Sequence, residues 1–340
     1  MFSRDRLLQL TEAMQGKFIV VYGDIVADRF IYGTPKRISR EAPVLILRQY
    51  RDDILLGGAG NAINNILALG GLPIPVSVVG SDAEGTALIE RLTSQGIDCG
   101  GVLRVDRYKT PTKVRILGGM PHASRQQIVR YDIEDSLTIT GEEAERFAWM
   151  LRDQISICHA GLISDYGYGV VTPSLAANLT GFSKGKPVTL DSRYDLLRYP
   201  DVTAATPNEE EAAAAAGMSL TEDETGENVE FVGQTLQQSL DAEAILITRG
   251  SRGMMLLERS GKPLFIPVSG TDQVADVTGA GDTVIATFTL ALAAGGSYVE
   301  AAKLANYAGG IVVMKMGTAT ASNEELRHAI ERDEELRNPE

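Results

Sequence analysis

The stretch "DVTGAGDTVIATFTLALAAGG", residues 276–296, joins a turn of small residues to an apolar segment that predicts a buried helix. The run Gly279-Ala280-Gly281 allows backbone N–H groups to approach a ligand closely, and the helix dipole favours an anion there. Asp282 could simply cap the helix, a role worth roughly 0.3–1 kcal/mol. Capping would explain one acid but not the whole array, so the array favours a phosphate-binding site.

The rest of the chain alternates apolar strands with helix-compatible segments. Residues 17–24 ("KFIVVYGD") predict a buried strand, residues 60–71 ("GNAINNILALGG") a helix, and residues 73–82 ("PIPVSVVGSD") the next strand. The same alternation continues through "ISICHAGLISD", "KPVTLDS" and "AEAILITRG". This order predicts an α/β fold with a doubly wound, mostly parallel sheet, and ligands bind such sheets at the carboxyl ends of the strands.

Two segments interrupt this alternation. Residues 31–56 and about 102–132 are rich in strand-forming residues and turns, with no helix inside them. They predict a small antiparallel sheet inserted as a lid within a single domain spanning residues 1–340. The apolar run "VLIL" at 44–47 would be too exposed on a lone lid, so we expect lid-to-lid pairing in a homodimer.

The composition limits the possible partners. A formal net charge of −13 disfavours nucleic acid and anionic membranes. A basic cluster within residues 36–51 still leaves room for a small anionic substrate, because distant charges are screened over ~8–10 Å. No apolar run reaches the ~18 residues of a membrane span, and the first residues are charged. We therefore expect a cytoplasmic protein.

The D-x-T-G-A-G-D array of residues 276–282 resembles the signature of the ribokinase (PfkB) carbohydrate kinase superfamily. The resemblance implies a ribokinase-like fold and ATP as phosphoryl donor. It also implies that Gly279, Ala280 and Gly281 form an anion hole for the transferred group and that Asp282 is the catalytic base. Such an arrangement suits phosphoryl transfer, which needs positioning, charge stabilisation and a proton acceptor for the alcohol.

The resemblance extends to the first strand and the helix after it. It implies that five residues hold the sugar: Asp24, Asp28, Gly57, Gly58 and Asn61. Carboxylate and amide groups suit vicinal hydroxyls, and glycines let the backbone approach. The Gly-Gly pair alone could equally mark a tight turn, and it gains weight from the array at 276–282.

The segment "ATPNEEE" contains Asn208 and Glu211, which in this family organise magnesium and the phosphates, generally through water. Residues three apart share a helix face. The alternative is local: Thr206 as N-cap and Glu209 three residues on would form a capping box, with Pro207 in the first turn. Both interpretations can hold, since the two pairs lie on different faces.

The resemblance also covers three groups of residues that the family places around the nucleotide. The family places Thr248, Arg249 and Gly250 near the ATP phosphates or ribose, and Thr278 beside the anion hole. It places Asn306 and Gly309 at the adenine, although small residues on an apolar helix also suit plain packing. Residues 317–322 ("GTATAS") resemble a terminal loop that, in some members, helps bind a monovalent cation near Asp276.

Within the superfamily, the chain most resembles the kinase domains of bacterial ADP-heptose synthases, over almost its whole length. These domains phosphorylate D-glycero-β-D-manno-heptose 7-phosphate at the anomeric hydroxyl. The resemblance implies that Asp165 contacts the substrate, and the lid residues Arg37 and Arg130 are candidates for its phosphate. Each arginine could instead only solubilise a lid edge. We expect no nucleotidyltransferase domain, because no H-x-G-H motif occurs.

Two departures from that subfamily bear on the substrate. Tyr168 and Arg193 stand where its motifs usually carry lysines. Tyrosine removes a cation that could pair with phosphate, whereas arginine keeps the charge with a different geometry. A PfkB-type kinase for another sugar or a nucleoside is therefore an alternative. A non-catalytic sugar or nucleotide sensor is disfavoured, because a sensor needs no base such as Asp282.

Overall fold

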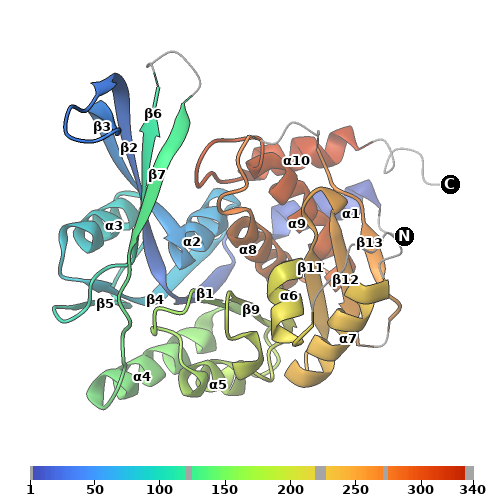
Figure 1. The fold of residues 1–340 in the computed structure, drawn as a ribbon. Helices are drawn as coiled ribbons and strands as arrows, with labels where there is room; N and C mark the ends of the chain where they lie inside the picture. The colour runs from blue at the N-terminus through green and yellow to red at the C-terminus, as the bar shows by residue number, and fades with distance from the viewer. Residues whose placement is uncertain (1–2, 120–124, 219–226, 260, 271–274, 334–340) are drawn as a thin grey trace.

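The computed structural model describes residues 3–119, 125–218, 227–259, 261–270 and 275–333 (Figure 1). Its main sheet has nine strands in the order β13-β12-β11-β10-β9-β8-β1-β4-β5. The strands are β1 (Phe18–Gly23), β4 (Leu72–Gly80), β5 (Val102–Val105), β8 (Ala160–Asp165), β9 (Val188–Ser192), β10 (Ala204–Ala205), β11 (Ala244–Thr248), β12 (Met254–Glu258) and β13 (Leu264–Ile266). The strands from β11 to β5 run parallel; at one edge β12 is antiparallel to β11, and β13 is antiparallel to β12.

Helices cover both faces of this sheet. One face carries α1 (Arg4–Ala13), α2 (Ala59–Ala68), α3 (Ala83–Ser94), α8 (Ala280–Ala293), α9 (Tyr298–Val312) and α10 (Asn323–Arg332). The other carries α4 (Glu142–Ile157), α5 (Pro173–Phe182), α6 (Glu209–Ala215) and α7 (Glu227–Leu240). Successive residues of a strand point to opposite faces, so Val21 joins one core and Tyr22 the other. The predicted doubly wound α/β class is confirmed.

The lid is a separate four-stranded sheet that stands above one end of the main sheet (Figure 1). Its strands are β2 (Ile25–Ile38), β3 (Leu45–Gly58), β6 (Thr112–Gly118) and β7 (Gln126–Ile133), in the order β3-β2-β6-β7. The prediction of a fully antiparallel lid is wrong, because β2 and β6 pair in parallel. The chain returns to the lid from β5, at the edge of the main sheet, and so enters β6 in the same direction as β2.

The predicted lid boundaries also need correction. A single residue, Asp24, separates β1 from β2, so the lid strand begins at Ile25 rather than at residue 31. Residues 102–105 belong to the main sheet, where they pair with β4. Residues 120–124 of the predicted lid lie outside the described residues. Across the helices that the structure does describe, none is long and apolar enough to cross a membrane.

Candidate functional site

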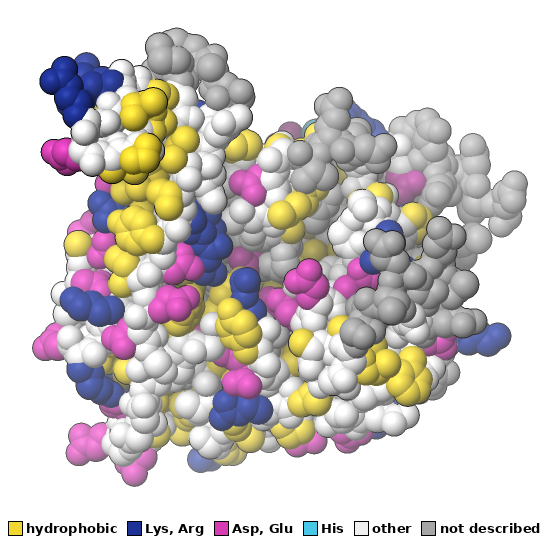
Figure 2. Space-filling view, viewed as in Figure 1, with side chains coloured by type: hydrophobic (Ala, Val, Ile, Leu, Met, Phe, Trp, Pro, Cys, Tyr) yellow, Lys and Arg dark blue, Asp and Glu magenta, His cyan; other side chains and the backbone are white. Residues whose placement is uncertain are grey.

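The predicted site residues gather where the carboxyl ends of β1, β8 and β9 meet the first turns of α2 and α8, below the lid. Figure 2 shows a hollow at this place, with Lys or Arg and Asp or Glu side chains around its rim. Because parallel strands end at the same edge, residues from distant parts of the sequence become neighbours here.

Asp282 lies in the first turn of α8 and is only 2% exposed. Its Oδ2 accepts a hydrogen bond from Asn61 Nδ2 at 2.9 Å, and its Oδ1 accepts one from the Tyr166 hydroxyl at 2.8 Å. Burial raises the pKa of this carboxyl to about 6, although both hydrogen bonds act to lower it. Asp282 is thus a fixed carboxylate with the proton affinity that a base at neutral pH needs.

The turn before α8 is built around the same asparagine. Gly279 adopts the left-handed conformation (φ 77°), and Asn61 Nδ2 also donates to its carbonyl at 3.2 Å. A side chain at this glycine would be strained and would collide with Asn61. Asn65 holds Asn61 in turn, with 3.0 Å from its Nδ2 to the Asn61 carbonyl. Asn61 therefore joins α2 to the start of α8 and orients the Asp282 carboxylate.

Asp28 points from β2 into the same hollow and is 4% exposed. It forms an ion pair with Arg115 of β6. A Cβ at Gly57 would collide with this carboxylate, so glycine is required there for the two strands and the acid to pack together. Asp28 and Gly57, which were both predicted to hold the sugar, thus lie side by side, and their contact with sugar stays a prediction.

Asp24 differs from this expectation. It is fully buried, and its two carboxylate oxygens accept hydrogen bonds from the backbone N–H groups of Tyr166 (2.8 Å), Tyr168 (3.3 Å) and Val170 (3.2 Å). Burial, with some repulsion from Asp165, raises its pKa to about 7. A carboxylate enclosed in this way holds the loop after β8 and has no face for a sugar, so Asp24 is a positioning residue.

Asp165 is enclosed in a similar way and is 3% exposed. It accepts hydrogen bonds from the hydroxyls of Ser192 and Tyr199, both at 2.8 Å, and from the N–H of Gly167 at 2.9 Å. These contacts join the ends of β8 and β9. Protein donors occupy its oxygens, as they do those of Asp282, and the expected contact of Asp165 with substrate stays a prediction.

A cavity of about 460 Å³ opens beside the first turn of α8. Residues predicted for the nucleotide line it together with small apolar neighbours: Thr248, Gly250, Ala280, Gly281, Asn306 and Gly309. Asn306 is held by a hydrogen bond of 2.8 Å to the Pro267 carbonyl. A Cβ at Gly281 would meet no atom within 4 Å, so this face of the turn is open to a ligand. The size and lining suit an adenine nucleotide.

Two residues predicted for the nucleotide lie outside this lining. Arg249 pairs with Glu209 of α6 (2.9 Å) and stacks over the Phe265 ring, so its guanidinium supports the turn of residues 250–252. Thr278 donates through both its N–H and its hydroxyl to Asp276 Oδ1, at 2.9 and 2.7 Å. Direct contacts of these two side chains with ATP stay predictions.

Asn208 and Glu211 form the capping box of α6: each side chain accepts from the other's backbone N–H, at 2.9 and 3.0 Å. The predicted capping box of Thr206 and Glu209 is wrong. The helix starts two residues later than predicted, at Glu209 rather than at Pro207, and the Thr206 hydroxyl is buried with no hydrogen-bond partner.

Glu211 also faces Asp191 at the end of β9. Burial, together with the charges of Glu211, Asp282 and Asp165, raises the pKa of Asp191 well above its usual value, and burial raises that of Glu211. Two half-buried acids that form no ion pair with any described residue fit a divalent cation. No group of three or more ligating side chains occurs in the described part of the chain. Magnesium is usually held in proteins through one or two carboxylates and the substrate's phosphates, and Asp191 and Glu211 could supply such carboxylates.

The loop of residues 317–322 contacts the array of residues 276–282, as predicted. The N–H of Gly317 donates to Asp276 Oδ2 at 3.0 Å, and the Thr318 hydroxyl is buried with no partner in the structure. Burial opposes ionisation of Asp276, but the hydrogen bonds from Thr278 and Gly317 outweigh it and lower its pKa. A negatively charged Asp276 beside an unsatisfied hydroxyl fits a small cation.

The two lid arginines predicted for a substrate phosphate lie in different places. Arg37 is exposed near the outer end of β2; nine residues separate it from Asp28, about 30 Å at the ~3.3 Å rise of a strand. It is too distant to contact a sugar at Asp282. Arg130 faces the site from β7, but it is paired with Asp132.

Three site residues escaped the sequence analysis as functional candidates: Tyr166, Asp191 and Lys113. Lys113 Nζ lies 4.8 Å from the centroid of the Tyr166 ring. Tyr166 and Asp191 end neighbouring parallel strands, a signal that the strand-end rule could have used. Lys113 carried no such signal, because only the lid pairing brings β6 over the site.

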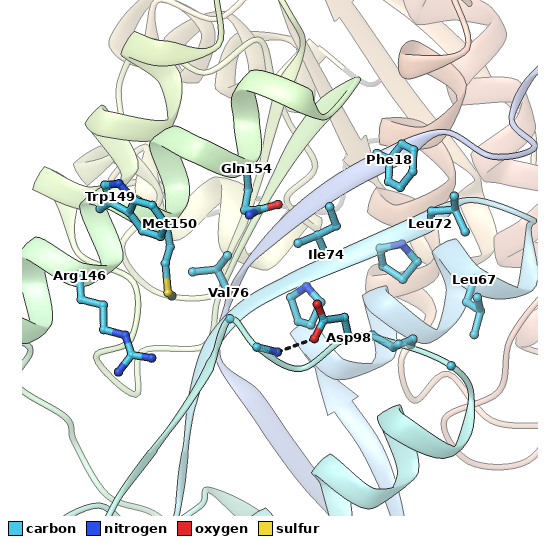
Figure 3. A pocket seen from close by; sticks show the side chains of 16 residues that line it. Phe18, Leu67, Leu72, Ile74, Val76, Asp98, Arg146, Trp149, Met150 and Gln154 are labelled. Atoms are coloured by element: carbon cyan, nitrogen blue, oxygen red, sulfur yellow. Dashed lines mark hydrogen bonds between the residues drawn. The ribbon is translucent and has the colours of Figure 1, made fainter.

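A second hollow, of about 490 Å³, lies beside the amino-terminal halves of β1 and β4. Figure 3 shows α4 on one side of it, with Trp149 and Arg146, and Phe18 and Ile74 on the strands opposite. Asp98 accepts from a backbone N–H within the loop before β5. None of the predicted site residues lines this hollow.

Comparison with known proteins shows the family of this chain. Residues 17–326 match the model of the pfkB family carbohydrate kinases. Bifunctional protein HldE of Geobacter sulfurreducens is 39% identical over 310 residues, which cover 90% of this chain and 61% of that protein. The HldE of Coxiella burnetii (strain RSA 493) is 40% identical over 315 residues, 92% of this chain and 63% of that protein. The chain thus spans under two thirds of these relatives.

Solved structures share the fold at low identity. Phosphofructokinase-2 from Escherichia coli, in complex with potassium, superposes with a TM-score of 0.75 at 18% identity, covering 95% of this chain and 100% of that one. Ribokinase of Arabidopsis thaliana, complexed with ribose and ATP, gives 0.70 at 20% identity, over 94% and 100%. The family match covers most of the chain. The chain belongs to the pfkB family of carbohydrate kinases.

Proposed function

We propose that this chain is an ATP- and magnesium-dependent sugar kinase that phosphorylates D-glycero-β-D-manno-heptose 7-phosphate at its anomeric hydroxyl. One arrangement carries the proposal: Asp282, buried and oriented by Asn61 and Tyr166, follows Gly281 of the nucleotide-sized cavity and lies near the charges of Asp28 and Lys113 of the lid. An acceptor on one side and a phosphoryl donor on the other would meet at this carboxylate.

The chain's own groups account for the chemistry. Asp282 takes the proton of the sugar hydroxyl as the hydroxyl oxygen attacks the γ-phosphorus, and ADP leaves. The first N–H groups of a helix lack intrahelical partners, so those at the start of α8 can stabilise the charge of the transferred group. Bound magnesium would supply charge neutralisation at the phosphates, held through Asn208 and Glu211 by way of water, beside Asp191. The lid would exclude water from the sugar.

The heptose assignment is supported by the two HldE relatives, at 39% and 40% identity. The substitution at Tyr168 does not count against it, because this side chain is 8% exposed and its hydroxyl bonds to Glu134 at 3.3 Å, away from Asp282. Arg193 keeps a positive charge at the second position. A kinase for another sugar or a nucleoside is the alternative that the same site would serve.

We include in this proposal a monovalent cation bound near Asp276 and Thr318. We expect a higher rate of phosphoryl transfer in potassium than in a large organic cation. A cytoplasmic location, where ATP is supplied, stays a prediction.

We further propose a homodimer formed through the lids. A band of apolar side chains runs along the lid in Figure 2, and Val44 and Leu45 are 56% and 42% exposed. Pairing of lids would remove these side chains from water. Light scattering should give the mass of two chains at micromolar concentration, and the double change Val44→Asp with Leu45→Asp should halve it. A wild-type mass of one chain would contradict the dimer.

A screen of ADP formation tests the kinase assignment. The purified chain is incubated with ATP, magnesium and single members of a panel of sugars, sugar phosphates and nucleosides. We expect the highest kcat/KM with the heptose 7-phosphate. A higher value for a neutral sugar or a nucleoside would select the alternative acceptor, and ADP formation with none of them would refute the kinase.

A further inference from the structure

The underside of the lid presents an ordered set of charges to the site. Pairing between strands aligns Asp28 of β2 with Lys113 of β6, and Lys113 with Asp132 of β7. One row further along, Arg115 of β6 aligns with Arg130 of β7. Residues two apart on a strand share a face, and paired residues share it across strands. All five charged side chains therefore belong to one face.

Four of these five charges neutralise one another. Arg115 pairs with Asp28, and Arg130 pairs with Asp132. Lys113 is the charge left over: among the described residues, no carboxylate lies within ion-pair distance of its ammonium. Yet Lys113 is half-buried, and burial lowers the pKa of its ammonium. A cation partly removed from water without an anion is costly, which suggests that the anion arrives with a ligand.

Two further features surround this ammonium. It lies over the face of the Tyr166 ring, whose hydroxyl binds Asp282, so the cation and the base are close but not in contact. Arg193, on the loop after β9, has no ion-pair partner in the described residues either, and its charge opposes that of Lys113. An anion between the two would relieve this repulsion.

We propose that Lys113 binds the phosphate monoester that the sugar carries in addition to its reacting hydroxyl, and so makes the site specific for a sugar phosphate. This rests on the proposed kinase function and names the residue that selects its substrate class. The sugar then spans from the ammonium to Asp282, with its phosphate at Lys113 and its reacting hydroxyl at the base. A lysine suits phosphate as a compact point charge.

The test compares Lys113→Met with Lys113→Arg, which keeps the charge. Lys109→Met is the matched control, because Lys109 is exposed in the connection before β6. Calorimetry measures binding of the heptose 7-phosphate and of the same heptose without phosphate, and steady-state kinetics measure kcat and KM for both. Circular dichroism checks that each variant is folded.

We expect Lys113→Met to weaken binding of the phosphorylated heptose about 10-fold or more, mainly through KM, and to leave the neutral heptose unchanged. Lys113→Arg should recover much of the loss, and Lys109→Met should match wild type. Equal losses for both sugars, or none, would overturn the role of Lys113 while kinase activity still stood. Wild-type protein that binds neither sugar would overturn both proposals.

Discussion

Two hollows of this molecule have nearly the same volume and lie near opposite ends of the strands. The one at the carboxyl ends of the strands, about 460 Å³, borders the open face of Gly281, the residue before Asp282. The one beside the amino-terminal halves of β1 and β4, about 490 Å³, is walled mainly by side chains such as Trp149 and Ile74. The larger hollow has no buried acid poised at its edge. Volume alone therefore does not identify the site; the convergence of strand ends and a helix start does.

The largest effect is expected when Asp282, the proposed base, is replaced. Asp282→Asn keeps the shape of the side chain and should lower kcat roughly 10²–10⁴-fold, because a positioned proton acceptor contributes about that much. Nucleotide affinity, measured by calorimetry, should stay near the wild-type value. A variant that turns over normally would exclude Asp282 as the base.

The next effect concerns the hydroxyl that holds the base. In the wild type, kcat/KM should fall below about pH 6, as Asp282 becomes protonated. Tyr166→Phe removes a hydrogen bond that favours the charged form, so the pKa of Asp282 should rise and the acid limb should move to higher pH. Losing one bond to a charged group should lower kcat/KM at neutral pH roughly 10-fold.

Tyr168→Phe is the control for this prediction. Its hydroxyl bonds to Glu134 rather than to Asp282, so the pH profile should match the wild type. If both variants shifted the profile equally, the link between Tyr166 and the base would be wrong.

A smaller effect on the rate is expected when Glu211, one of the two neighbouring acids Asp191 and Glu211, is replaced. Glutamine can still accept the N–H of Asn208, so Glu211→Gln should keep the capping box of α6. It removes a charge facing Asp191, and the magnesium concentration for half-maximal rate should rise roughly tenfold, as for residues that hold a metal through water. An unchanged magnesium titration would leave Glu211 with its capping role only.

The smallest effect is expected at the second hollow, which none of the predicted site residues lines. Trp149 is 66% exposed and is the only tryptophan of the chain. Trp149→Ala should leave kcat and KM unchanged within about twofold, as for surface substitutions generally. In the wild type, tryptophan emission should not respond to ATP with magnesium. A large change in either measurement would mean that the second hollow takes part in function.

Much of the fold could be predicted because buried parallel strands form continuous apolar runs, as in "FIVVYG" of β1. The pairing of the lid could not, because the parallel contact between β2 and β6 depends on residues about 85 apart and not on local periodicity. The start of α6 was misplaced for a related reason. Thr206 and Asn208 are both good N-caps, and contacts at Thr248 decide between them.

The candidate site also depends on long-range contacts that the sequence alone does not predict. Asp24 and Asp28 look alike in the sequence, four residues apart beside the same strand. One is enclosed by three N–H groups of the loop after β8, and the other pairs with Arg115 at the hollow. Which carboxylate remains available to a ligand depends on a segment about 140 residues away. The array at 276–282 could be predicted because its glycines, its acid and its helix are contiguous.

The most direct test of the account follows the γ-phosphate of ATP in a single turnover. Enzyme in excess over γ-labelled ATP is mixed with magnesium and the heptose 7-phosphate, and phosphorus-31 spectroscopy locates the transferred group. The account predicts a second phosphate on the anomeric oxygen in the wild type and in Trp149→Ala, with transfer slowed at least 100-fold in Asp282→Asn. Label released as inorganic phosphate, or transferred equally fast by Asp282→Asn, would contradict it.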